Sequence, residues 1–397
     1  MFEYLSYILC FGTVIIIFIY IYIRVKYGFW VYQPVFHQYD IGYIFSPPGI
    51  IQHSLPEKNK YTNFKDIDTI VFSELSSIQK TRFINLIKLH YLRNKDNIFS
   101  PQTENIMPYF IGHNDKSFVS FFYKDNHIID LKKGTMITDR QIVGALTSRP
   151  LNVIINTNNI KIKVYYADYL CVDKLNRKKG IAHQLIQTHE YNQRRINKNI
   201  VISLFKREDK LTGIVPLCVY STYGFPVDTW TKPPDLTGQY KLLEINASNY
   251  RFIYDFIHNN SNKFDIIIKA DMPNILELIK TKNIFVYAVL CDEEILSCYF
   301  FRKSCVQIEK GLEALNFFAS ICDCEEDIFI LGFKISFWKI AAENFFGFAA
   351  LENISHNNII INNIMLKTKP IIISPTAYFF YNFAYPTFKS NKVLLIN

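Results

Sequence analysis

Four basic residues and a glycine near the middle of the chain have the types and spacing of a phosphate-binding turn. Lys174, Arg177, Lys178 and Lys179 precede Gly180. Cationic side chains attract phosphate, and glycine lets the backbone approach a ligand closely. The first N–H groups of a following helix would add donors aimed at the same point. A basic loop that is merely solvated is the alternative interpretation.

The residues on either side of this turn predict the elements that position it. From Ile162, polar and apolar residues alternate loosely in a segment rich in Val, Tyr and Ile, which predicts a strand. After Gly180, apolar residues at positions 181, 182, 185 and 186 have helical spacing. The predicted order is therefore strand, basic turn and helix, and small Ala182 would let the helix lie close to the strand.

These residues resemble those of a known family. Arg177-x-x-Gly180-x-Ala182 after a strand resembles the acyl-CoA pyrophosphate loop of the N-acetyltransferase (GNAT) superfamily. The wider segment from Tyr169 to Ile186 is similar to the first signature of eukaryotic-type N-myristoyltransferases, without a gap. Phe29-Trp30 followed by Gln33-Pro34-Val35 resembles the segment that opens the catalytic domain of that family. In the family this segment lies against the CoA part of the co-substrate.

The resemblance implies myristoyl-CoA, or another acyl-CoA, as the co-substrate, and no metal. It implies that the residues in contact with the co-substrate are Tyr27, Phe29, Trp30, Tyr169, Leu170, Cys171, Val172, Arg177, Lys178, Lys179, Gly180, Ile181 and Ala182.

The resemblance also implies the catalytic groups. In the family a strand bulge turns two backbone amides toward the thioester oxygen, and here they belong to Tyr169 and Leu170. Fixed donors of this kind stabilise a developing oxyanion. The family uses its own C-terminal carboxylate, here that of Asn397, to deprotonate the attacking amine. Asp168 and Asp173 are the alternative bases. We expect Cys171 to be a packing residue, although a thiol mechanism stays open, and His183 to lie at the surface.

On the peptide-binding side the resemblance is weaker. Tyr91, Asp96, Phe99 and Tyr220 match residues of segments that handle the peptide. However, only Asp96 survives from an acidic run, and Arg93 and Lys95 replace its neighbours. Lys206-Arg207-Glu208 aligns with a Thr-Ala-Gly that helps to position the substrate amine, and a Gly-x-Gly-Asp-Gly near Lys367 is missing. A preference for basic peptides would therefore be weakened or reversed.

The N-terminal segment predicts a membrane anchor. Leu5 to Ile23 is almost entirely apolar and, as a helix, would be about 28 Å long, close to the hydrocarbon thickness of a bilayer. Arg24 and Lys26 follow it, so the positive-inside rule places the downstream domain in the cytosol. The alternative is a buried N-terminal helix.

Composition limits the other possibilities. The net charge of +9 fits an anionic partner, but the basic residues form no long run, which argues against nucleic acid. The eight cysteines include no Cys-x-x-Cys pair with histidine partners, so we expect free thiols and no zinc site.

Together these features predict an α/β protein. Residues 1–26 would form the transmembrane anchor, residues 27–230 an acyl-CoA-binding GNAT-like half, and residues 231–397 a second half with the peptide groove and the C-terminal carboxylate. The two halves would share a mixed sheet with helices on both faces. The expected function is myristoyl transfer to the N-terminal glycine of a protein. The alternatives are an acyltransferase with another chain or acceptor, and an inactive, membrane-tethered adaptor that binds acyl-CoA or a lipidated peptide.

Overall fold

The computed structural model describes residues 2–92, 97–130, 135–208, 213–308 and 311–397. Asp96, which the sequence suggests as a peptide contact, lies outside these ranges. The helices are α1 (Phe2–Tyr27), α2 (Ile41–Phe45), α3 (Ser77–His90), α4 (Thr103–Ile106), α5 (Ile181–Ile196), α6 (Tyr250–Asn259), α7 (Met272–Lys280), α8 (Glu326–Asn344) and α9 (Asn357–Met365).

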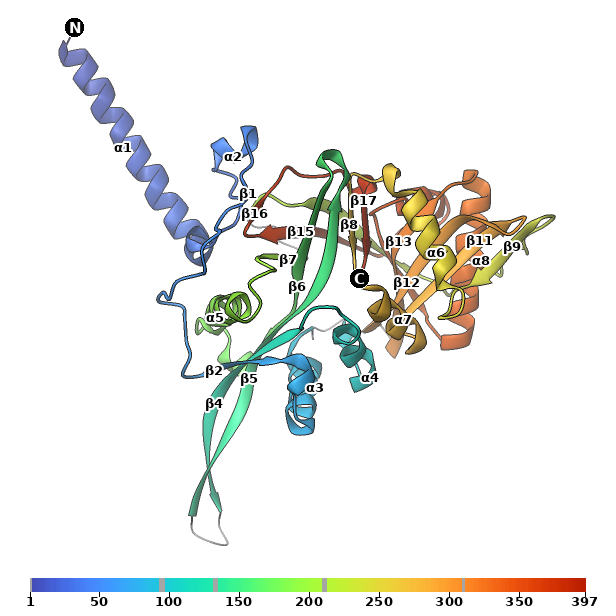
Figure 1. Cartoon of the computed structure of the whole chain (residues 1–397), viewed down its shortest axis with the longest axis horizontal. Helices are drawn as coiled ribbons and strands as arrows, with labels where there is room; N and C mark the ends of the chain where they lie inside the picture. The colour runs from blue at the N-terminus through green and yellow to red at the C-terminus, as the bar shows by residue number, and fades with distance from the viewer. Residues whose placement is uncertain (1, 93–96, 131–134, 209–212, 309–310) are drawn as a thin grey trace.

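The strands are β1 (Gly49–Ile50), β2 (Ile67–Val71), β3 (Ile98–Phe99), β4 (Phe118–Asp130), β5 (Thr135–Ile155), β6 (Ile160–Val172), β7 (Ile202–Glu208), β8 (Cys218–Pro226), β9 (Tyr240–Glu244), β10 (Ile266–Lys269), β11 (Ile284–Cys291), β12 (Glu294–Ile308), β13 (Leu312–Cys322), β14 (Phe348–Glu352), β15 (Ile372–Tyr381), β16 (Phe383–Ala384) and β17 (Val393–Ile396). Within the described residues, all of them except β1 and β16 belong to one 15-stranded mixed sheet, which runs through the middle of the molecule (Figure 1).

The sheet contains the same arrangement twice. In the first half, antiparallel β4, β5 and β6 are followed by α5 and by β7, which runs parallel to β6. In the second half, antiparallel β11, β12 and β13 are followed by α8 and by β14, which runs parallel to β13. Strands β8 and β15 lie between β7 and β14 and join the halves. The prediction of two tandem halves in one mixed sheet is confirmed.

Helices cover both faces of each half. On β5, Gly144 faces Leu185 of α5, whereas its neighbour Ala145 belongs to the core cluster that includes Phe83 of α3. Successive strand residues point to opposite faces, so α5 and α3 lie on opposite sides of the sheet. In the second half α8 packs against Tyr299 and Phe301 of β12, and α6 and α7 lie on the other face.

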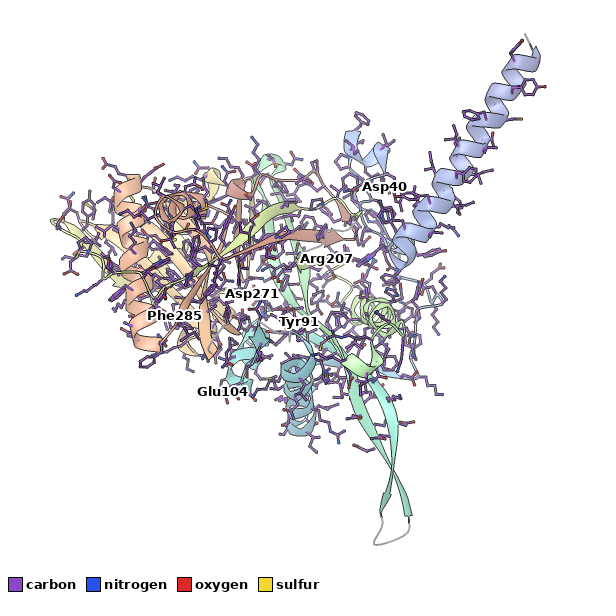
Figure 2. The ribbon with its side chains drawn as sticks, turned by 180° about the vertical axis from the view of Figure 1, so that it is seen from behind. Asp40, Tyr91, Glu104, Arg207, Asp271 and Phe285 are labelled. Carbon is purple, nitrogen blue, oxygen red and sulfur yellow. The ribbon has the colours of Figure 1, made fainter. Side chains whose placement is uncertain are left out.

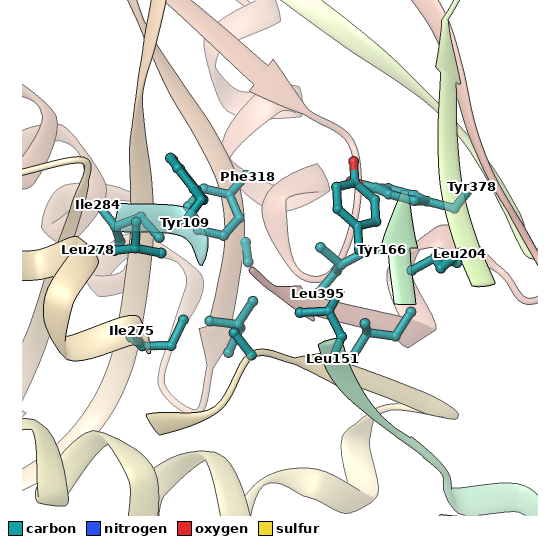
Figure 3. Close-up of a cluster of buried hydrophobic side chains, with 14 of the residues drawn as sticks. Tyr109, Leu151, Tyr166, Leu204, Ile275, Leu278, Ile284, Phe318, Tyr378 and Leu395 are labelled. Carbon is teal, nitrogen blue, oxygen red and sulfur yellow. The ribbon is translucent and has the colours of Figure 1, made fainter. Parts of the chain in front are cut away.

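One hydrophobic core crosses the boundary between the halves. Leu151 and Leu204 of the first half share a cluster with Ile284 and Phe318 of the second (Figure 3). Leu395 of β17 belongs to the same cluster, because β17 pairs with β10 and β10 pairs with β5. The chain therefore ends in the interior.

The N-terminal helix stands apart from this body. Helix α1 extends away from the sheet (Figure 1). Within the described residues it is the one helix that is long and apolar enough to cross a membrane. The candidate span, Leu9–Tyr32, extends past the end of α1 at Tyr27 into the following short 3-10 helix, and its most apolar stretch is not buried. The alternative of a buried N-terminal helix is therefore wrong.

Local residues account for the continuity of β5 and the start of α3. Strand β5 continues through Pro150, which pairs with Tyr165 of β6. Helix α3 begins at Ser77, because Ser76 accepts a hydrogen bond from the Gln79 N–H in a capping box.

Candidate active site

The basic turn joins β6 to α5, as the sequence predicts. Lys178 and Gly180 both have positive φ, of 61° and 79°, and Gly180 immediately precedes the first helical residue, Ile181. Glycine adopts this conformation without steric cost. The turn borders a cavity of about 480 Å³, which we call the smaller cavity. Its lining includes eight of the predicted contacts: Leu170, Cys171, Val172, Arg177, Lys178, Gly180, Ile181 and Ala182.

The basic side chains of the turn differ in their freedom. The Arg177 guanidinium donates to the backbone carbonyls of Val172, at 3.1 Å, and of His90. The Lys179 ammonium donates to Asn176 Oδ1 at 3.1 Å. Lys178 is exposed and lines the smaller cavity. Arg177 therefore links the turn to β6 and α3, whereas the Lys178 ammonium is free to contact a ligand in the smaller cavity.

A β-bulge lies at the two predicted amide donors. The pairing of β5 with β6 shifts register between Ala145 and Thr147, so that Tyr169 and Leu170 have no one-to-one partner on β5. Tyr169 has a φ of 49°, and its N–H donates to Asp168 Oδ1 at 2.8 Å. A bulge re-aims the backbone of one strand, which is the local geometry that the oxyanion-hole hypothesis requires.

A second cavity, of about 650 Å³, opens where β6 and β7 separate; we call it the larger cavity. The parallel pairing of the two strands ends at Ala167 and Phe205. Beyond this point β6 stays paired with β5, and β7 stays paired with β15. Asp168, Tyr169 and Leu170 line the gap from β6, and Lys206, Arg207 and Glu208 line it from β7. Tyr91 and Leu170 border both cavities, which are therefore adjacent.

The larger cavity has a wall on each face of the sheet. On the α5 face, Ile186, His189 and Gln193 line it together with Leu146 and Ser148 of β5, whose hydroxyl donates to Gln193 Oε1. On the opposite face the lining is aromatic and cationic, with Tyr109, Arg149, Tyr166, Lys206, Arg302 and Tyr378.

Two of the predicted peptide contacts lie at this cavity. Tyr91 and Phe99 both line it, and their rings lie 5.6 and 6.4 Å from that of Tyr169. Figure 2 shows Tyr91 and Arg207 near the middle of the molecule. Tyr220 lies behind the wall, because its ring stacks on Tyr378 and its hydroxyl donates to Glu352 at 2.6 Å.

The segment after α1 reaches the site through aromatic contacts. Phe29 is buried and stacks on His183, with ring centroids 4.5 Å apart, and His183 lines the smaller cavity. Trp30 lines the larger cavity and stacks on Phe205. Tyr27 borders neither cavity and packs against Gly213 and Tyr39. His183 is exposed, as the sequence predicts, but the sequence did not predict that its ring stacks on Phe29.

A buried charged cluster forms the wall opposite α5, and the sequence motifs did not indicate it. The Glu352 carboxylate lies 3.3 Å from Lys206 Nζ and 3.9 Å from Arg302 Nη2, and it accepts a hydrogen bond from Asn316 at 2.9 Å. Burial would raise the pKa of Glu352, but the charges of Lys206 and Arg302 outweigh burial and hold this pKa below its ordinary value. In the sequence, the replacement of Thr-Ala-Gly by Lys206-Arg207-Glu208 was the only sign that charged residues lie in this wall.

Asn397 lies next to this cluster. It is 1% exposed, and its side-chain oxygen accepts a long hydrogen bond from Arg302 at 3.4 Å. Arg302 lines the larger cavity, and Asn397 lies behind it. The structure thus brings Asn397 to the Arg302 face of the cavity.

The other candidate groups have structural surroundings. Burial raises the pKa of the Cys171 thiol to about 12, and its Sγ contacts the Leu86 carbonyl at 3.8 Å. A thiol with this pKa is a poor nucleophile. Asp173 caps the turn by accepting from the Leu175 N–H, and it lines neither cavity. In the part of the chain that the structure describes, no three His, Cys, Asp or Glu side chains form a group suited to a metal ion.

Comparisons with known proteins define the fold. No protein-family model and no curated protein sequence matches this chain. Among solved structures, it is similar to a tandem GNAT protein from the clavulanic acid biosynthesis pathway, with 9% identity and a TM-score of 0.52, over 81% of this chain and 100% of that one. The repeated topology and this likeness define the class: the chain has a tandem GNAT fold.

Within that class the likeness to one enzyme is stronger. Saccharomyces cerevisiae N-myristoyltransferase with bound myristoyl-CoA aligns over 92% of this chain and 94% of that one, with 14% identity and a TM-score of 0.69. A second structure of the same yeast enzyme, also with bound myristoyl-CoA, gives a TM-score of 0.68 at 14% identity, over 92% and 89% of the two chains. The fold of this chain is therefore that of N-myristoyltransferase, with a strongly diverged sequence.

Proposed function

We propose that this protein is an N-acyltransferase that moves a long acyl group, such as myristoyl, from acyl-CoA to the N-terminal glycine amine of a protein. The observation that carries the proposal is the pair of adjacent cavities at the β6–β7 separation, one bordered by the basic turn and the other by the β-bulge. Both structures of the yeast enzyme of the same fold contain bound myristoyl-CoA.

The smaller cavity would hold the phosphates of CoA. Lys178 and the first N–H groups of α5 supply positive charge and donors there, and Arg177 keeps the turn in shape. Phe29 supports this wall by stacking on His183.

The chemistry follows from the groups around the larger cavity. The amides of Tyr169 and Leu170 would stabilise the oxyanion at the thioester carbon, with the Tyr169 N–H exchanging its bond to Asp168 for one to the substrate. The carboxylate of Asn397 would take the proton of the acceptor amine, because an ammonium has no lone pair for attack. The tetrahedral species then expels the CoA thiolate.

We further propose that residues 1–26 anchor the protein in a membrane as a single span, with the enzyme domain in the cytosol. The apolar stretch of α1 that is not buried supports the span, and Arg24 and Lys26 at its end support the orientation.

The second candidate function is an inactive adaptor that binds acyl-CoA or a lipidated peptide at the membrane. Two observations favour it. Lys206 and Glu208 occupy the positions of the amine-positioning Thr-Ala-Gly, and the Tyr169 N–H is already bonded to Asp168. A transfer assay separates the two functions.

The test begins with acyl-CoA binding. Calorimetric titration of the full chain in detergent with myristoyl-CoA should show saturable binding. The variant Lys178→Ala with Lys179→Ala should bind at least about tenfold more weakly, because charge-assisted contacts to phosphate contribute about 1.5–3 kcal/mol each. The control variant Lys161→Ala with Lys198→Ala removes two exposed charges away from the turn and should bind like wild type.

The second step measures transfer of labelled myristate to peptides that begin with glycine. Transfer with wild type supports the enzyme. Binding without transfer to any peptide supports the adaptor. Unchanged affinity in the Lys178 and Lys179 double variant would reject the proposed phosphate site.

A further inference from the structure

Arg149 is a buried cation in the larger cavity that the proposed reaction does not use. It lies on β5, opposite Tyr166 of β6, and is 1% exposed. Its Nε and Nη1 have no hydrogen-bond partner in the protein. In the described part of the chain, no carboxylate forms an ion pair with it.

The surroundings of Arg149 compensate its charge only in part. The guanidinium carbon lies 4.8 Å from the ring centroid of Tyr109 and 5.0 Å from that of Tyr166. A cation over a ring gains roughly 0.5–2 kcal/mol, whereas a buried ion without a counter-ion costs several kcal/mol. The rings also leave the N–H donors unsatisfied, so the site is built for a group that is both anionic and a hydrogen-bond acceptor.

The carboxylates near Arg149 are already bonded to other groups. Lys206 and Arg302, on the same wall, already share the Glu352 carboxylate. Asp168 also lines the cavity, but its Oδ1 accepts from the Tyr169 N–H. Glu190 and Glu208 line the cavity as well, but they form ion pairs with Arg194, at 3.9 Å, and with Lys206, at 3.3 Å. A carboxylate for Arg149 would therefore come from a bound molecule.

The position of Arg149 indicates which substrate brings the anion. It lies on the wall that includes Arg302, which contacts Asn397, and opposite the wall formed by α5. If Asn397 supplies the base, the acceptor amine approaches along this wall. The cations also disfavour an ammonium there and so favour the neutral, nucleophilic form of an amine.

We propose that Arg149 binds a carboxylate of the acceptor, so that the preferred acceptor is a glycine followed closely by acidic residues. This inference rests on the proposed acyl transfer for the identity of the acceptor. Arg recognises carboxylate through two parallel N–H bonds, which an amide of the same shape does not match.

The test compares three peptides that differ only after the glycine, with three Asp, three Asn or three Lys. Binding to the full chain is followed by calorimetry and by tryptophan fluorescence, to which Trp30 in the cavity lining contributes, with and without myristoyl-CoA. The Asp peptide should bind at least about tenfold more tightly than its Asn isostere, and the Lys peptide most weakly. In Arg149→Gln, the Asp and Asn peptides should differ by less than about threefold.

Arg140→Gln is the matched control, because Arg140 lies on the same strand but is largely exposed and outside the cavity lining. It should keep the wild-type preference. If Arg149→Gln does not fold, as judged by circular dichroism, Arg149→Lys is used instead. Lysine keeps the positive charge but lacks the two parallel N–H donors of the guanidinium, so it should reduce the preference for the Asp peptide over the Asn peptide. If neither variant folds, the wild-type comparison of the Asp and Asn peptides decides.

The outcomes separate this inference from the proposed function. Equal binding of the Asp and Asn peptides by wild type, or a preference that survives in Arg149→Gln, overturns the anion site even if transfer occurs. An Arg149-dependent preference without any acyl transfer supports the anion site and rejects the enzyme.

Discussion

At the scale of single residues, buried polar side chains determine the character of the larger cavity. One wall contains three cations, those of Lys206, Arg302 and Arg149. Glu352 lies behind this wall and forms ion pairs with Lys206 and Arg302. On the other wall His189 lies between two serine hydroxyls and is buried. Lys206, Arg302, Glu352 and His189 each have polar partners in the wall, so removing one of those partners should cost more than removing an exposed charge.

Replacement of Glu352 by Gln tests the charged cluster. The change keeps the side-chain shape but leaves Lys206 and Arg302 without their shared counter-ion. We expect a loss of about 3–5 kcal/mol in the free energy of unfolding, measured by urea denaturation. Glu343→Gln, at an exposed position of α8, is the control and should change stability by less than about 0.5 kcal/mol. A loss below about 1 kcal/mol in Glu352→Gln would contradict the assigned role.

His189 predicts a pH dependence of stability. Its two ring nitrogens each lie 2.8 Å from a serine hydroxyl, of Ser120 and Ser148, and burial lowers its pKa to about 4. The folded pKa is thus below the unfolded value of 6.5, so this stabilisation is complete above about pH 6.5 and is lost as the pH falls toward 4. From about pH 7 to about pH 5 the loss from this residue should be about 2 kcal/mol.

The measurement compares the wild type with His189→Gln by urea unfolding at both pH values. The variant should show less of the decrease, and His258→Gln, at an exposed site on α6, should keep all of it. An unchanged pH dependence in His189→Gln would mean that other groups cause the effect.

At the scale of elements, the separation of β6 from β7 and the position of β17 organise the site. The separation opens the larger cavity beside the bulge. The basic turn between β6 and α5 borders the smaller cavity. Strand β17 runs parallel to β10, and the Ala270 N–H donates to the Ile396 carbonyl, so Asn397 is held in the interior. The end of the chain thereby lies behind the Arg302 wall of the larger cavity.

A short C-terminal extension tests the role of β17. Three added residues such as Gly-Ser-Gly cannot fit beside the buried Asn397 and would convert its carboxylate into an amide. We expect loss of acyl transfer with myristoyl-CoA affinity within about threefold of wild type, because the basic turn belongs to β6 and α5. The same extension before Met1 should leave both unchanged. A full transfer rate after the C-terminal extension would place the base elsewhere, and Asp168, which lines the larger cavity, would be replaced next.

At the scale of the whole molecule, one continuous sheet joins the halves, and α1 lies outside it. The core crosses from one half to the other, so the cavity between them is a feature of the complete fold (Figure 3). By contrast α1 contributes no buried stretch to that core, and the first contacts with the body are made by Tyr27 and Phe29. The body should therefore fold without α1.

Deletion of residues 1–26 tests the anchor. The shortened protein should move from the membrane fraction to the soluble fraction, keep its circular dichroism spectrum and bind myristoyl-CoA within about threefold of wild type, because Phe29 and its stacking on His183 are retained. The full-length protein should resist extraction by carbonate and yield to detergent. Release by carbonate alone would show that α1 does not span the bilayer.

Features that depend only on neighbouring residues were predictable from the amino-acid sequence. The strand, the basic turn with Gly180 and the helix from Ile181 were predictable because side-chain period and glycine conformation act locally. The apolar length of α1 was readable for the same reason, and the signature around Tyr169 indicated the bulge. The tandem topology followed from the resemblance that these residues carry.

The polar lining of the larger cavity, by contrast, depends on contacts between segments that are far apart in the chain. Arg149, Lys206, Arg302 and Glu352 come from β5, β7, β12 and β14, and strand pairing across both halves brings them together. The sequence pattern gives no sign that Arg149 is buried between two tyrosines, since Tyr109 lies 40 positions earlier in the chain. Burial and pairing depend on contacts between distant segments, and these contacts set the charge of the cavity wall.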